Sequence, residues 1–126
     1  MLWPEIRKSA DSLLFAFLFA VHLWINRAAV AIEFVVDTGF AGFLTLPLAA
    51  VQALGLPSQY DTPANLADDS VVQLPVYEAI IMWDGVERAA RVLAMGRRPL
   101  LGMALLDGSE LLLQCRDGGV VTIENL

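Results

Sequence analysis

The residues that decide the fold form the run VAIEFVVDTG, from Val30 to Gly39. Apart from Glu33, its first seven residues are apolar and rich in β-branched side chains, which is typical of a buried strand. Asp37 follows this strand directly, and a carboxylate in such a place is costly to desolvate unless it is hydrogen-bonded. Taken alone, Asp37-Thr38-Gly39 also fits a turn, in which Asp and Thr bind backbone N–H groups and Gly supplies a positive φ. The triplet alone does not distinguish a structural turn from a catalytic site, so the surrounding sequence is needed.

After this run the sequence predicts short strands separated by turns. Pro47–Leu54 reads as a short helix, because Gly55 suits the left-handed position after a helix and Pro57 prevents its continuation. Asp84-Gly85 is a two-residue hairpin signal between two apolar runs. The further expected strands are Ala64–Leu66, Val71–Leu74, Val76–Trp83, Val86–Leu93, Leu111–Cys115 and Val120–Ile123, and Met103–Leu106 is expected to form one helical turn. This spacing predicts a small, mostly β, barrel-like domain with one or two short helices.

Composition excludes several classes of function. Of 126 residues, 57% are hydrophobic and only 17% charged, so the chain is not of the disordered class and is long enough for one domain with its own core. The net charge is −6, so the chain lacks the positively charged surface that nucleic-acid binders need, and this class is excluded. The single cysteine, Cys115, cannot form an internal disulfide, and one His with one Cys cannot build a structural zinc site.

The first 27 residues read differently from residues 28–126, which we take as the domain. Leu13–Ile25 is apolar except for His22, but a membrane-spanning helix needs about 20 such residues. The run fits the core of a signal peptide, with Ala29-Val30-Ala31 as a cleavage site. It also fits an apolar element packed on the domain or a partner, or a misassigned gene start. We expect it to lie at the periphery of the barrel, so a chain that begins near Arg27 should keep the strand motifs and be more soluble. The expected location is cytoplasmic, with membrane association through this segment as the alternative.

Several motifs, in order, resemble the small bacterial members of the single-domain, retropepsin-like aspartic proteases. The resemblance covers Phe34 to Leu126. It rests on the catalytic strand and loop VVDTGFAGFLTLP (Val35–Pro47), the flap turn LADDS (Leu66–Ser70), VYEA (Val76–Ala79), WDG (Trp83–Gly85) and the hydrophobic-hydrophobic-Gly element LLGMALL (Leu100–Leu106). It implies a small closed β-barrel of the retropepsin-like type, preceded by the apolar N-terminal segment.

The resemblance also implies an aspartic endopeptidase that works as a homodimer on peptide or protein substrates, without a metal or cofactor. Asp37 from each chain would form a pair of carboxylates that share one proton, so that one activates a water and the other polarises the scissile carbonyl. Thr38 would brace the pair across the dimer axis, and Gly39 and Gly102 would allow close approach of backbone. The flap over the substrate would be built from Leu66, Ala67, Asp68, Asp69 and Ser70.

Two departures from the family pattern favour an alternative, a catalytically inactive retropepsin-fold module for dimerisation or peptide binding. Asp69 stands where the flap turn usually has Gly, and Met1–Ile25 lacks the polar hairpin that normally precedes the catalytic strand. Other polar residues are expected to be structural: Asp84 as a turn former and Cys115 as a buried strand thiol. We also expect Val120–Ile123 to be an exposed edge strand that joins two chains.

Overall fold

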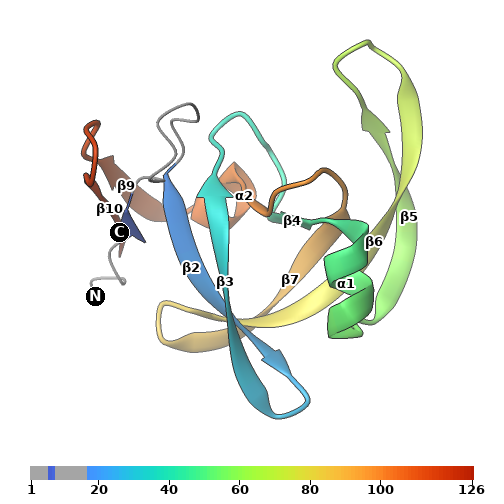
Figure 1. Ribbon diagram of the computed structural model, residues 1–126, viewed down its shortest axis with the longest axis horizontal. Coiled ribbons are helices and arrows are strands. Elements are labelled where there is room, and N and C mark those ends of the chain that lie inside the picture. The colour runs from blue at the N-terminus through green and yellow to red at the C-terminus, as the bar shows by residue number, and fades with distance from the viewer. Residues whose placement is uncertain (1–5, 8–16) are drawn as a thin grey trace.

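The computed structural model describes residues 6–7 and 17–126, and most of them lie in strands (Figure 1). The strands are β1 (Ile6–Arg7), β2 (Leu18–Ile25), β3 (Ala28–Val36), β4 (Leu44–Leu46), β5 (Ser58–Asn65), β6 (Val71–Trp83), β7 (Val86–Ala94), β8 (Leu100–Leu101), β9 (Ser109–Leu113) and β10 (Val120–Asn125), and the helices are α1 (Leu48–Leu54) and α2 (Met103–Leu106). One sheet has the order β2-β3-β8-β4-β7-β6-β5, and a second has the order β1-β10-β9. The expected mostly β fold with two short helices is confirmed.

The larger sheet curls until its first strand meets its sixth. β2 pairs antiparallel with β6 at Leu23 and Ile81, which closes a ring of six strands, β2-β3-β8-β4-β7-β6. β5 lies outside this ring and pairs with the first half of β6. Since a single residue pair closes the ring, the seam is much shorter than that of a full barrel.

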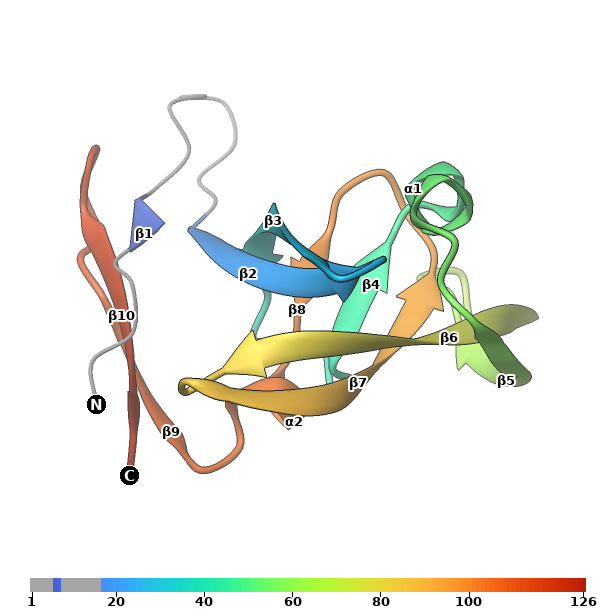
Figure 2. The same ribbon diagram turned by 90° about the horizontal axis from the view of Figure 1, so that it is seen from below.

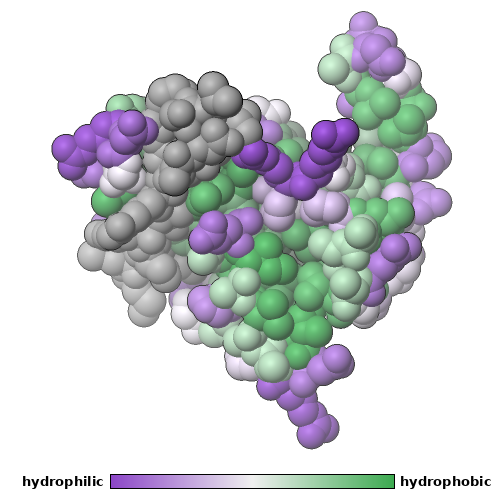
Figure 3. Space-filling model, in the orientation of Figure 1, coloured by the Kyte–Doolittle hydropathy of each residue, from purple (hydrophilic) through white to green (hydrophobic). Residues whose placement is uncertain are grey.

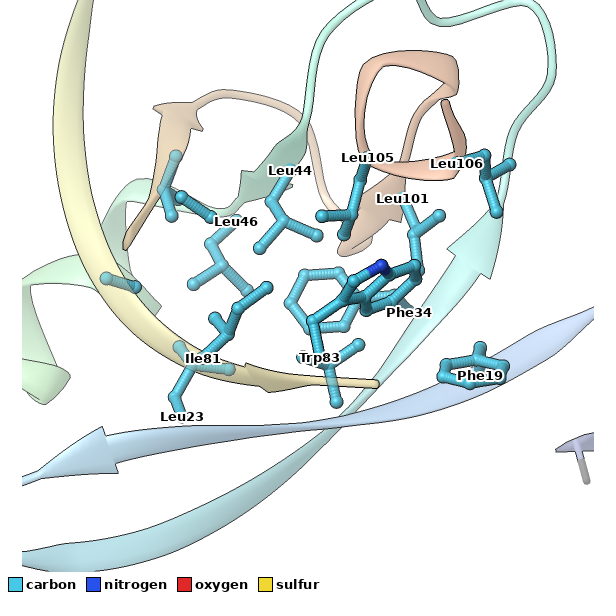
Figure 4. Packing of buried hydrophobic residues seen from close by; sticks show 14 of the residues in the cluster. Phe19, Leu23, Phe34, Leu44, Leu46, Ile81, Trp83, Leu101, Leu105 and Leu106 are labelled. Atoms are coloured by element: carbon cyan, nitrogen blue, oxygen red, sulfur yellow. The ribbon is translucent and has the colours of Figure 1, made fainter. Parts of the chain in front are cut away.

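Side chains that point into the ring form the hydrophobic core (Figure 4). Phe34 on β3 and Leu23 on β2 are completely buried, and the rings of Phe19 and Trp83 lie 5.9 Å apart at 54°. Neighbouring residues on a strand point to opposite faces, so each strand contributes every second side chain to this core. Burial of one such large side chain contributes roughly 1.5–3 kcal/mol. The strands that carry the candidate site are held together mainly by these contacts.

The expectation that Leu13–Ile25 lies at the periphery is wrong for the residues that the structure describes. Leu18–Ile25 is β2, a strand of the ring, and it pairs with β3 along its whole length. Phe19, Val21 and Leu23 point into the core, whereas His22 and Trp24 are exposed. This alternation cannot be read from the sequence, because residues on the outward face of the strand are apolar too. Residues 13–16 lie outside the described residues.

The turn between β2 and β3 lies at Asn26 and Arg27, the predicted boundary of the domain. Both residues have positive φ, 49° and 67°, as the tight turns of two-residue hairpins require. β3, the strand that leads to Asp37, is therefore the second arm of a hairpin whose sequence is apolar. Among the residues described, no helix is long and apolar enough to cross a membrane.

The turn and helix signals of the sequence are confirmed at two places. Asp84 and Gly85 have φ of 55° and 70° and connect β6 to β7 in a hairpin. α1 begins after Pro47, and Gly55 after its end has φ 67° and ψ 33°, the left-handed conformation. One expectation is wrong: Cys115 is exposed, because β9 ends at Leu113 before it reaches the cysteine.

The small sheet stands beside the ring and contains both ends of the described chain (Figures 1 and 2). β10 lies in its middle and not at its edge, which corrects the expectation for Val120–Ile123. β1 covers β10 only at Val120 and Val121, whereas β9 pairs with it from Val121 to Asn125. From Thr122 onward, the described residues therefore place a strand on only one side of β10.

Candidate active site

Asp37 lies at the point where β3 leaves the ring, and its backbone is fixed by β8. The two strands run parallel, with Val36 opposite Leu101. The N–H of Asp37 donates to the carbonyl of Leu101 at 2.9 Å, and the N–H of Val35 donates to that of Pro99 at 2.8 Å. Because β8 belongs to the ring, the position of Asp37 is determined by the core rather than by a free loop.

The Asp37 carboxylate is half-buried, and one of its oxygens is held by the turn that follows. The N–H of Gly39 donates to Asp37 Oδ1 at 2.9 Å, and the N–H of Phe40 donates to the Asp37 carbonyl at 3.1 Å. The hydrogen bond from Gly39 to the carboxylate is the one that a turn at this triplet predicts, and it also orients the carboxylate, but Gly39 does not have the expected positive φ. Thr38 and Gly39 are exposed. A Cβ added at Gly39 would lie 3.3 Å from Asp37 Oδ1, closer than most such contacts.

The loop after Asp37 is docked on the segment around Gly102. Three N–H groups of this segment donate to carbonyls of the loop. Gly102 donates to Phe43 at 2.9 Å, Met103 donates to Phe40 at 2.8 Å, and Ala104 donates to Gly42 at 3.1 Å. A Cβ at Gly102 would lie 2.3 Å from the Gly42 oxygen and 2.7 Å from the Phe40 oxygen. Only glycine allows this approach of the two backbones, so the structure brings Gly102 directly against the loop that carries Asp37.

Thr45 is a supporting residue that the sequence analysis missed. It is the buried polar residue of the core, and its Oγ1 accepts a hydrogen bond from the N–H of Leu100 at 3.1 Å. β4 and β8 pair antiparallel at these two residues, so the hydroxyl satisfies a backbone donor in the strand that holds Asp37. The sequence signal that could have identified Thr45 is a single hydroxyl residue between two leucines in an otherwise apolar strand.

The predicted flap is a hairpin of β5 and β6 that projects from the body of the molecule, with a hydrophilic tip (Figure 3). At its turn, the N–H of Leu66 donates to the carbonyl of Ser70 at 2.8 Å, and Asp69 has a φ of 66°. Asp tolerates this left-handed conformation better than most residues, so the turn forms without the usual Gly. Asp68 accepts hydrogen bonds from the hydroxyl and the N–H of Ser70, which lower the pKa of its carboxyl.

A cleft of about 280 Å³ lies between the loop after Asp37 and the arms of the flap. Its walls are mostly apolar and come from five parts of the chain: Ala41, Gly42, Phe43, Leu44, Tyr60, Thr62, Val76, Arg91, Leu93 and Ala104. The cleft begins only two residues after Gly39. The turn at residues 66–70 does not line it; the flap contributes Tyr60 and Thr62 from β5 and Val76 from β6. We call this cleft, with all ten of its lining residues, the flap-side cleft.

A second cavity of about 210 Å³ lies between the tip of the β2–β3 hairpin and the end of α1, where Trp24, Leu56 and Glu78 are among its lining residues. It shares no residue with the flap-side cleft. Neither cavity offers a metal site: within residues 6–7 and 17–126, no group of three His, Cys, Asp or Glu side chains could hold a metal ion.

Comparisons with known proteins agree with this architecture. No protein-family profile matches the sequence, and no curated protein matches it. A solved structure of a retropepsin-like aspartic protease from Rickettsia conorii is similar, with a TM-score of 0.59 and 18% sequence identity over 100% of this chain and 94% of that chain. At this identity the likeness shows the fold alone. The chain has a retropepsin-like fold.

Proposed function

We propose that this protein is an aspartic endopeptidase whose active site forms between two identical chains, with Asp37 from each. The observation that carries the proposal is the placement of Asp37. Its backbone is tied to β8, its Oδ1 accepts from Gly39, and an open cleft begins a few residues away. The retropepsin-like fold of the chain supports the same assignment.

The reaction needs two carboxyl groups with different protonation. The ionised carboxylate removes a proton from a water molecule, whose oxygen attacks the carbonyl carbon of the scissile peptide bond. The protonated carboxyl gives its proton to the carbonyl oxygen, so that a tetrahedral diol forms. When this diol collapses, the C–N bond breaks, the nitrogen takes up a proton, and a carboxylic acid and an amine leave. One carboxyl group cannot act as base and acid in the same step.

In this proposal the second carboxyl is the Asp37 of another chain, since Asp-Thr-Gly occurs once among the 126 residues. Two-fold symmetry is the commonest oligomer symmetry and would bring two identical loops together on its axis. The small sheet offers a surface for it. From Thr122 onward one side of β10 carries no described strand, so the backbone groups of this edge are open to pairing with another chain.

The decisive experiment is Asp37→Asn, assayed on an unfolded protein mixture with new N-termini detected by mass spectrometry. The amide cannot take up the proton of water, so we expect cleavage to fall by about 10²–10⁴-fold while the fold persists. Asp61→Asn is the matched control, since Asp61 is exposed on β5 and does not line the cleft. The specific activity of the wild-type protein should also fall on dilution, as dimers dissociate.

Cleavage that persists in Asp37→Asn would refute the assignment. A wild-type protein that dimerises and binds peptides but never cleaves them would favour the alternative, an inactive retropepsin-fold module.

A further inference from the structure

The flap-side cleft contains one charged residue in an otherwise neutral lining. Arg91 on β7 lies among apolar residues that include Phe43, Leu93 and Val76, and two hydroxyl side chains from β5 complete the wall. The chain as a whole carries a net charge of −6, so a basic group at this place is opposite in sign to the protein.

The orientation of Arg91 follows from its strand. Val92, the next residue, is fully buried in the core, so Arg91 and Leu93 on either side of it point to the opposite face of the sheet, into the cleft. On β5 the same alternation places Tyr60 and Thr62 in the cleft. The cleft wall is therefore the outer face of β5, β6 and β7.

No ion pair within the described part of the chain neutralises Arg91. Glu78 stands opposite Arg91 in the β6–β7 register and on the same face of the sheet, but the two side chains form no ion pair, and Glu78 also lines the second cavity beside the end of α1. Arg88 lies 5.8 Å from the ring centroid of Phe43, but it does not line the cleft, so Arg91 is the charged group of this wall. A guanidinium has five N–H donors arranged to bind a carboxylate through two parallel hydrogen bonds.

We propose that the flap-side cleft selects a substrate residue with an acidic side chain, whose carboxylate pairs with Arg91. The inference rests on the proposed function, since it assigns a specificity to the peptide site beside Asp37. Glutamate fits better than aspartate, because its longer methylene stem can cover the apolar wall while its carboxylate reaches the guanidinium. The hydroxyls of Tyr60 and Thr62 supply further donors at the same wall.

The test measures binding separately from cleavage. The Asp37→Asn variant, which leaves peptides intact, is titrated with labelled octapeptides of alanine and phenylalanine that carry one Glu at each position in turn, or Gln at the same position. At one position, we expect Glu to bind about fivefold more tightly than Gln, as for an exposed ion pair. The preference should shrink when the salt concentration rises from about 0.05 M to about 0.5 M.

Adding Arg91→Gln to this variant should remove the preference, and Arg91→Glu should reverse it toward peptides with Lys in place of Glu. Arg27→Gln is the matched control, because Arg27 is exposed at the tip of the β2–β3 hairpin and lines neither cavity. Circular dichroism checks that each variant is folded. A missing Glu preference, or one that survives Arg91→Gln, overturns the inference.

The two proposals can fail separately. If the wild-type protein cleaves no peptide but the Glu preference depends on Arg91, the protease assignment fails and the acidic specificity stands. If the wild-type protein cleaves peptides without regard to acidic residues and binding shows no Glu preference, the specificity fails and the protease assignment stands.

Discussion

Replacing Gly102 by Ala should separate the loop that carries Asp37 from the segment on which it is docked. The new Cβ would lie 2.3 Å from the Gly42 oxygen, so that oxygen has to move by roughly 1 Å to reach an ordinary contact distance. The movement strains three hydrogen bonds, from the N–H groups of residues 102–104 to the loop carbonyls. Overpacking and weakened hydrogen bonds together should lower the free energy of unfolding by about 3 kcal/mol.

The assay is urea unfolding followed by tryptophan fluorescence, which the buried Trp83 should report, at one fixed protein concentration because dimerisation also stabilises the fold. Gly55→Ala is the matched control. Gly55 has a φ of 67° and nothing within 4 Å of an added Cβ, so its variant carries only backbone strain, about 1–2 kcal/mol. Gly102→Ala should lose peptidase activity as well, and Gly55→Ala should keep it. If Gly102→Ala is no less stable than Gly55→Ala, the close packing described here is wrong.

Further changes test three other parts of the structure: the ring closure, the core hydroxyl and the flap turn. Leu23→Ala should cost about 2–5 kcal/mol in urea unfolding, because this completely buried side chain lies at the ring closure, and a chain that begins at Arg27 should fail to fold by circular dichroism. Thr45→Val should cost about 1–3 kcal/mol by leaving the N–H of Leu100 buried without an acceptor, whereas Thr45→Ser should cost less. Ser70→Ala should raise the pKa of Asp68 in an NMR titration. Since the folded-state pKa is lowered, the stabilisation from this contact is present above the ordinary value and lost as pH falls through the folded-state value.

The sequence was sufficient where a single residue type determines the backbone. Asp84-Gly85 predicts its hairpin, and Gly55 predicts the end of α1, because few residues adopt a positive φ easily. Gly102 is different, because its partners Phe40 and Gly42 lie far away in the sequence, and only the family resemblance implied its close backbone approach. Asp84-Gly85 and Gly55 are local signals, and no knowledge of distant partners is needed to interpret them.

The sequence was insufficient where distant partners decide. β2 looks like a continuous apolar run because its outward residues, such as Leu18 and Trp24, are apolar too, and only the pairing with β3 and β6 shows which face is buried. The turn after β2 could not be recognised by a glycine, because Arg27 adopts the positive φ that a glycine usually supplies. Arg91 gave no signal by itself, since its significance depends on the loop and the flap that surround it.

The pairing of β1 with β10 has a consequence for how the chain folds. Ile6 lies opposite Val121, so the two ends of the described chain meet in one sheet, and the ring closes between Leu23 and Ile81, also far apart in sequence. Contacts between residues so distant along the chain slow folding, because the loop entropy is lost before the contacts form. During synthesis, β1 cannot pair until Val120 and Val121 have left the ribosome. We expect the β2–β3 and β6–β7 hairpins to form early and the small sheet to assemble last.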